Sequence, residues 1–143
     1  MQKEKISRHQ FLKSMGLGGS ALVAVYCAST ALSSCTNESG AVIPAGGLTL
    51  DLTSSANAAL KTTGGFVVQN SIVIANVGGG KYVAVTQVCS HEGKKQVTYQ
   101  NGEFYCTAHG ARFDTAGKGL NANGKGGLKT YTVSVSGNTL TLS

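Results

Sequence analysis

With 143 residues, the chain is long enough for one domain of ordinary size together with a targeting segment. It contains 20 glycines, one proline and no tryptophan, a composition typical of an all-β domain with many turns. The formal charge is +6. Residues 1–34 contain four basic residues and one acidic residue, and the remainder contains eight basic and five acidic residues. Because no basic run is interleaved with aromatic residues, the sequence argues against nucleic-acid binding.

The N-terminus is typical of an export signal. A positively charged stretch, "MQKEKISRHQFLK", precedes an apolar run of 12 residues, Ala21–Leu32. That run is shorter than the roughly 20 residues that a membrane-spanning helix needs, so we expect a signal peptide over residues 1–34. An uncleaved anchor helix over residues 15–32 is the alternative.

Two short motifs refine this prediction. The stretch "SRHQFLK" resembles the twin-arginine export motif, with His9 where the second arginine should be. The stretch "LSSC", Leu32–Cys35, resembles a bacterial lipobox, whose cysteine is lipidated; Cys27 is a poorer candidate because the bulky Tyr26 precedes it. We therefore expect lipidation of Cys35 and a protein anchored by acyl chains in the cell envelope of a bacterium, on the periplasmic side or the outer surface.

After the signal, the sequence predicts a polar tether over residues 35–47 and one β domain over residues 48–143. Alternating apolar residues bounded by turn residues indicate strands and hairpins, and only residues 54–63 suggest a short helix. The expected strands lie in residues 48–52, 66–69, 72–76 and 81–87, in both arms of 96–106, and twice in 129–143. The expected reversals are Asn70-Ser71, Gly78–Gly80, Asn101-Gly102 and Gly137-Asn138.

Two cysteines remain in this domain, Cys89 in "CSHEG" and Cys106 in "CTAHG", and each is followed closely by a histidine, His91 or His109. An exported chain with two cysteines suggests a disulfide. A cysteine nucleophile would use one histidine as its base and leave the second pair unexplained. A zinc site could use all four residues, but paired zinc ligands usually have two to four residues between them, and here only Ser90 separates the first pair.

The two boxes resemble the Rieske signature, which is C-x-H, a gap of about fifteen residues and C-x-x-H-G. The gap here is 14 residues, from Glu92 to Tyr105. In Rieske proteins the cysteines bind one iron of a 2Fe-2S cluster and the histidines bind the other. The resemblance therefore implies that the cluster ligands are Cys89, His91, Cys106 and His109, and it explains the short first spacing, since the two residues of a box reach different irons.

The resemblance extends over residues 48–143 and implies an all-β, Rieske-type fold of stacked antiparallel sheets with two cluster-binding hairpin loops. Gly93 and Gly110 follow the histidines, where we expect tight backbone turns. Many relatives cover the cluster with a G-P-A loop. Here the matching segment is "GKGLNANGKGG", residues 117–127, without proline, which predicts a shorter or more mobile cover.

Four positions depart from the quinol-oxidising relatives. Those relatives carry an extra cysteine in each box, joined in a disulfide, where this chain has Lys94 and Ala108. They also carry a serine and a tyrosine whose hydroxyls bond to sulfur, where this chain has Ala111 and Phe113. Hydroxyl donors stabilise the reduced cluster, so these departures predict a ferredoxin-type centre of lower potential.

The sequence thus predicts an exported, lipid-anchored Rieske protein that carries single electrons to or from a redox protein partner and is not itself an enzyme. Four basic residues, Lys94, Lys95, Arg112 and Lys118, lie near the boxes, and the three lysines among them suggest that this partner has an acidic docking patch. The alternative is a small structural lipoprotein in which the same four ligands form a Cys2His2 zinc site.

Overall fold

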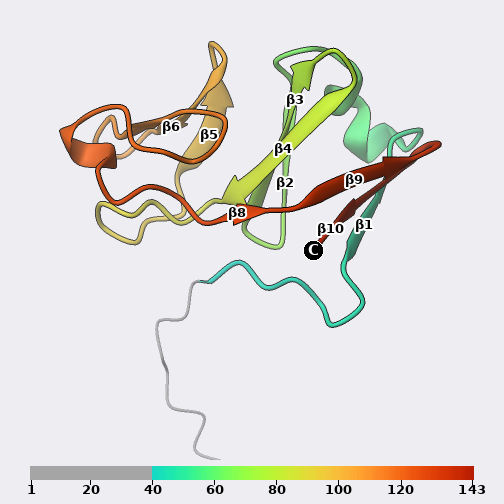
Figure 1. Cartoon of the computed structure of the whole chain (residues 1–143), viewed down its shortest axis with the longest axis horizontal. Helices are drawn as coiled ribbons and strands as arrows, with labels where there is room; N and C mark the ends of the chain where they lie inside the picture. The colour runs from blue at the N-terminus through green and yellow to red at the C-terminus, as the bar shows by residue number, and fades with distance from the viewer. Residues whose placement is uncertain (1–39) are drawn as a thin grey trace, which may run out of the picture. The chain divides into compact units, whose positions relative to one another are not determined.

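A computed structural model describes residues 40–143 of the chain, which contain ten strands and two short 3-10 helices (Figure 1). The predicted signal peptide, the lipobox and Cys35 lie outside the described residues. Within residues 40–143, no helix has both the length and the apolar character needed to cross a bilayer.

The strands form three antiparallel sheets. The first, in the order β1-β10-β9, contains β1 (Leu48–Asp51), β9 (Val133–Ser136) and β10 (Thr139–Leu142). The second, in the order β2-β3-β4-β8, contains β2 (Phe66–Gln69), β3 (Ile72–Gly78), β4 (Lys81–Thr86) and β8 (Thr130–Tyr131). The third, in the order β5-β6-β7, contains β5 (Val97–Gln100), β6 (Glu103–Cys106) and β7 (Arg112–Phe113). The prediction of an all-β fold of antiparallel sheets is confirmed.

The predicted reversals have the backbone geometry that hairpins require. Asn70 and Ser71, between β2 and β3, have φ of 50° and 60°, and Asn101 and Gly102, between β5 and β6, have φ of 52° and 83°. Positive φ at both central residues matches the right-handed twist of the paired strands. Each two-residue turn fixes the register of its hairpin, so that Gln69 pairs with Ile72 and Gln100 pairs with Glu103.

The expected short helix is η1 (Ser55–Lys61), a 3-10 helix that follows β1. Its N-cap is Ser54, whose hydroxyl oxygen accepts a hydrogen bond of 3.3 Å from the N–H of Ala56. Leu60 is fully buried on its inner side. The second 3-10 helix, η2 (Ala122–Gly124), lies in the glycine-rich segment before β8, where the sequence suggested no element.

Strand β3 is buried on both faces and separates two cores. Its Ile72 and Ile74 point to one side and its Val73 and Ala75 to the other, as the alternation of a strand requires. We call the first side the base core, which contains Leu50, Leu60, Ile72, Ile74, Ala84, Leu140 and Leu142. We call the second the cluster-side core, which contains Val73, Ala75, Val85, Cys89, Val97, Tyr99, Phe104, Cys106, Ala111 and Phe113.

The end of the predicted tether is in contact with the domain. Ala41 and Ile43 pack against the base core, and the hydroxyl of Tyr131 donates a hydrogen bond of 3.5 Å to the carbonyl oxygen of Ala41. The N–H of Gly47 closes a turn on the carbonyl of Pro44 at 2.8 Å. The chain therefore enters the domain beside β8, along a path held by apolar contacts.

Candidate metal centre

The two cysteine–histidine boxes form similar turns at the ends of two strands from different sheets. In the first box, which follows β4, the N–H of Gly93 donates to the carbonyl of Cys89 at 2.8 Å. In the second box, which begins at the last residue of β6, the N–H of Gly110 donates to the carbonyl of Cys106 at 3.0 Å. Each box thus closes on its own cysteine after four residues, with the histidine inside the turn.

The glycine expected at the end of each turn is needed there. Gly93 has φ of 68° and Gly110 has φ of 71°, a left-handed conformation that residues with a side chain rarely adopt. The second turn is also joined to the residue just before β7, because the N–H of Cys106 donates to the carbonyl of Ala111 at 2.8 Å. The expectation of tight turns after both histidines is confirmed.

Both thiols lie at the edge of the cluster-side core. Cys89 and Cys106 are each 1% exposed and neither forms a disulfide. Burial raises the pKa of the Cys89 thiol, because the thiolate would lose its hydration; the neighbouring Cys106 thiol raises it further, and the N–H groups of His91 and Glu92, which point at the sulfur, oppose the rise. A bound metal would reverse this balance by stabilising both thiolates.

The two histidines lie together on the outside of the site. The ring centroids of His91 and His109 are 5.2 Å apart in an edge-on arrangement, and the side chains are 34% and 37% exposed. A partner protein can therefore approach the imidazole side of the site, whereas the core covers the thiol side.

Glu92 joins this outer group, although the sequence did not mark it as a site residue. Its carboxylate lies 3.5 Å from Nδ1 of His109 and 4.0 Å from Nδ1 of His91, and it forms an ion pair of 3.0 Å with Lys94. The pKa of Glu92 is lowered, first by the hydrogen bond from Lys94. Its position within the first box was the only signal available.

The donor atoms fit a binuclear cluster better than a single ion. Oxygen and nitrogen donors of His91, Glu92 and His109 lie within 4.8 Å of one another, and this group includes neither cysteine. A tetrahedral zinc site needs all four ligand atoms around one point. A 2Fe-2S cluster of the Rieske type needs two thiolates at one iron and two imidazoles at the other, and the thiols and imidazoles are separated in this way.

The positions where related proteins carry hydroxyl groups are apolar and fully buried. Ala111 and Phe113 are each 0% exposed and belong to the cluster-side core. Phe113 pairs with Phe104 across β6 and β7. These two side chains therefore contribute packing and no hydrogen-bond donor toward the thiols.

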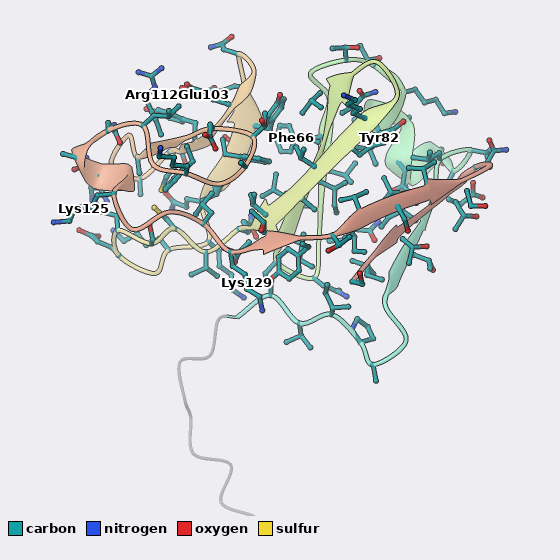
Figure 2. The ribbon with its side chains drawn as sticks, in the orientation of Figure 1. Phe66, Tyr82, Glu103, Arg112, Lys125 and Lys129 are labelled. Carbon is teal, nitrogen blue, oxygen red and sulfur yellow. The ribbon has the colours of Figure 1, made fainter. Side chains whose placement is uncertain are left out.

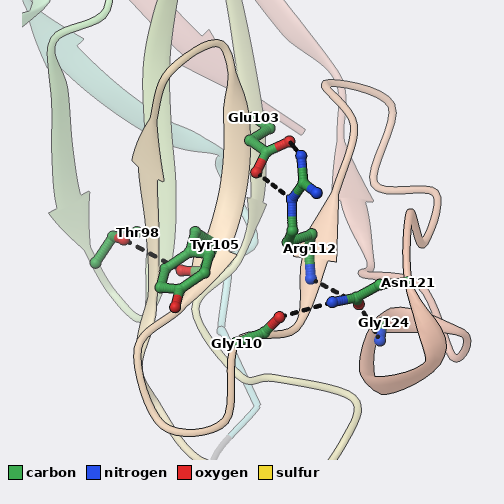
Figure 3. A network of polar contacts seen from close by, with 7 residues as sticks. All are labelled: Thr98, Glu103, Tyr105, Gly110, Arg112, Asn121 and Gly124. Atoms are coloured by element: carbon green, nitrogen blue, oxygen red, sulfur yellow. Dashed lines mark hydrogen bonds and ion pairs between the residues drawn. The ribbon is translucent and has the colours of Figure 1, made fainter.

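The basic residues near the site differ in how far they are neutralised. Arg112 forms a two-bond ion pair with Glu103, at 2.7 Å and 2.8 Å (Figure 3), which lowers the pKa of Glu103. Lys94 is paired with Glu92. Within residues 40–143, Lys95, Lys118 and Lys125 form no ion pair, and Figure 2 shows Lys125 pointing outward beside η2.

Comparison with known proteins gives one family match and several structural likenesses. The Rieske 2Fe-2S domain family matches residues 51–132. No curated protein gives a significant match. The cyanobacterial plasma membrane Rieske protein PetC3 from Synechocystis PCC 6803 is 35% identical, with 50% of this chain and 75% of that chain covered and a TM-score of 0.45.

Two further solved structures are more distant in sequence. The ferredoxin of carbazole 1,9a-dioxygenase from Nocardioides aromaticivorans IC177 is 20% identical, with 59% of this chain and 91% of that chain covered and a TM-score of 0.50. NdmA of Pseudomonas putida CBB5, solved with caffeine, is 21% identical, with 50% and 23% covered and a TM-score of 0.43. The ferredoxin likeness bears on the fold alone, and the chain spans less than a quarter of NdmA.

Proposed function

Because the chain belongs to the Rieske 2Fe-2S domain family, whose members transfer electrons through a 2Fe-2S cluster, we propose that it is an exported, lipid-anchored one-electron carrier. Its cluster ligands are Cys89, His91, Cys106 and His109. The observation that carries this assignment is the placement of two neighbouring thiols inside the core and two neighbouring imidazoles at the surface.

The bound cluster supplies a one-electron redox couple. The chain excludes water from the thiol side with Ala111, Phe113 and the rest of the cluster-side core. It leaves the imidazole side partly open, at 34% and 37% exposure. Electron exchange with a partner would therefore take place at the histidine end. The apolar positions 111 and 113, and Lys94 and Ala108 in place of the extra cysteines, support a ferredoxin-type centre of low potential without the extra disulfide of the quinol-oxidising relatives.

Iron and sulfide analysis of the purified protein tests the cluster. We expect two irons and two sulfides per chain, together with visible absorption bands. His91→Ala should abolish both, because each iron has only two protein ligands, whereas Gln100→Ala, at the exposed end of β5, should leave them unchanged. Stoichiometric zinc without iron would instead establish the structural zinc site.

The partner would carry an acidic docking patch. Lys95, Lys118 and Lys125 form no ion pair within the described part of the chain, so their charge is available to an incoming protein. Screening by salt weakens such attraction over about 10 Å at 0.1 M. Electron transfer to the partner should therefore slow as the salt concentration rises, and a rate that salt leaves unchanged would contradict acidic docking.

We also propose that the chain divides into a signal peptide (1–34), a tether (35–47) and a domain (48–143); the family match, at residues 51–132, lies within the domain and bears on that part alone. The motif "LSSC" supports lipidation of Cys35 and anchoring in a bacterial cell envelope. Cys35→Ala should move the protein from the membrane fraction to the soluble fraction, with Cys27→Ala as the matched control. Retention in the membrane after Cys35→Ala would indicate an uncleaved anchor.

A further inference from the structure

The segment of residues 117–127, which we call the cover loop, contacts both cysteine–histidine boxes. Toward the first box, Gly126 packs so closely on Ser90 that an added Cβ would lie 3.0 Å from the serine Cβ and Oγ atoms. Toward the second box, Nδ2 of Asn123 donates a hydrogen bond of 2.7 Å to the carbonyl oxygen of His109. The loop therefore bridges the two turns that present the ligands.

Asn121 uses its whole carboxamide to hold the loop on the second box (Figure 3). Its Nδ2 donates to the carbonyl of Gly110 at 2.8 Å, and its Oδ1 accepts from the N–H of Arg112 at 3.1 Å. The same Oδ1 accepts from the N–H of Gly124 at 3.0 Å, within the loop itself. One side chain thus fixes the backbone on both sides of Ala111 and joins it to η2.

The loop backbone is in direct contact with the segment that it covers. A Cβ added to Gly124 would overlap the carbonyl oxygen of Arg112, and one added to Gly119 would overlap the carbonyl oxygen of Gly124. Gly124 is itself buried. Close backbone approach of this kind lets short asparagine side chains reach main-chain groups that a looser loop would leave out of range.

We propose that Asn121 and Asn123 are positioning residues for the cluster ligand His109. Their carboxamides hold the main chain of residues 109–112, from which the imidazole projects, and they keep the cover loop closed without the ring of a proline. This inference rests on the proposed function, since it assigns a role toward the bound cluster. Groups that orient a ligand without touching the metal typically change metal retention by about 10–100-fold when removed.

The test uses the iron-loaded full-length protein and three alanine variants. Asn121→Ala and Asn123→Ala, which we call the clamp variants, each remove side-chain hydrogen bonds that hold the cover loop on the second box. Asn138→Ala, at the exposed turn between β9 and β10, is the matched control. We expect both clamp variants to lose iron to a chelator about tenfold faster than the wild type. We also expect them to change the histidine-nitrogen hyperfine coupling of the reduced protein, while the control matches the wild type in both measurements.

The outcomes separate this inference from the proposed function. If the clamp variants lose thermal stability but keep the wild-type chelation rate and hyperfine coupling, the asparagines support the loop only and the inference is wrong. If Asn121→Ala does not fold, Asn123→Ala decides, because it removes a single hydrogen bond. A wild-type protein that holds zinc without iron would overturn the proposed function together with this inference, whereas an iron-loaded wild type with unaffected variants overturns the inference alone.

Discussion

The two cores on either side of β3 contain different types of side chain. The base core is aliphatic and joins segments distant in sequence, since Leu50 of β1 lies with Leu140 and Leu142 of β10. The cluster-side core draws on residues 73–113 and contains aromatic rings and both thiols. Burial of apolar area stabilises both cores, but only the cluster-side core ends in thiols, which a bound metal would hold as thiolates. Both thiols thus belong to the core on one face of β3, and the core on the other face contains neither.

The largest expected effect is complete loss of the cluster from a protein whose base core stays folded. Under the proposed ligand assignment, Cys106→Ala removes one of the two thiolates that bind the same iron, so we expect complete loss of the visible spectrum and of bound iron. Amide hydrogen exchange should still show protection in β1, β3 and β10, because the aliphatic core does not contain the substituted residue. Uniform loss of protection throughout the domain would show that the base core depends on the cluster.

Truncation of a large side chain in the base core should lower the stability of the domain and leave the cluster in place. Leu140 is fully buried, so Leu140→Ala should lower the free energy of unfolding by about 2–5 kcal/mol, through lost burial and the cavity left behind. The folded fraction of this variant should keep the visible absorption bands of the cluster. Val135 lies opposite Leu140 on β9 and is 45% exposed, which makes Val135→Ala the control, with an expected change within about 0.5 kcal/mol. Urea unfolding measures both.

A smaller effect concerns the tuning of the cluster-side core. Ala111→Ser introduces a hydroxyl donor where the structure has a buried methyl group, and such a donor favours the reduced cluster. We expect the midpoint potential to rise by about 40 mV, which corresponds to about 1 kcal/mol of hydrogen-bond preference in a one-electron couple. Ala84→Ser, in the base core, should leave the potential unchanged. Equal shifts in both variants, measured by redox titration, would contradict the separate roles of the two cores.

The smallest effect is a pH-dependent one on the rim of the third sheet. Arg112 lowers the pKa of Glu103 below its ordinary value of 4.5 in the folded state, so their ion pair contributes stability above that value. The contribution is lost as the pH falls through the lower, folded-state pKa. Glu103→Gln should therefore slightly lower the thermal unfolding midpoint at pH 7, and its difference from the wild type should shrink as the pH is lowered step by step below 4.5, when both proteins are measured without cluster. A difference that stays the same size over the whole acid series would show that the ion pair is not the cause.

Local features of the fold and site could be read from the sequence because neighbouring residues determine them. The alternation in Phe66–Gln69 and Ile72–Gly78 and the pair Asn101-Gly102 predicted strands and a hairpin that the structure contains. Gly93 and Gly110 were expected at tight turns and have positive φ. In each case the backbone preference lies within a few residues, so no knowledge of distant contacts is needed.

Contacts between distant segments were not readable in the same way. The sequence placed Arg112 among the basic residues around the loops but did not indicate its pairing with Glu103, which arises because strand register places β6 beside β7. The missing proline predicted a shorter or more mobile cover, and the structure shows hydrogen bonds from Asn121 and Asn123 to the second box. Nothing in the local pattern of these asparagines distinguishes them from ordinary turn residues.

By itself, the sequence determined the strands, their turns and the two boxes of candidate ligands, since alternation, turn chemistry and ligand spacing are local properties of the chain. Only the tertiary structure decided that the thiols lie inside and the imidazoles outside, that Glu92 lies between the histidines, and that the cover loop bridges both boxes. These features depend on how three sheets and their loops come together. The physical reason is that register and packing bring into contact groups whose separation along the chain carries no signal.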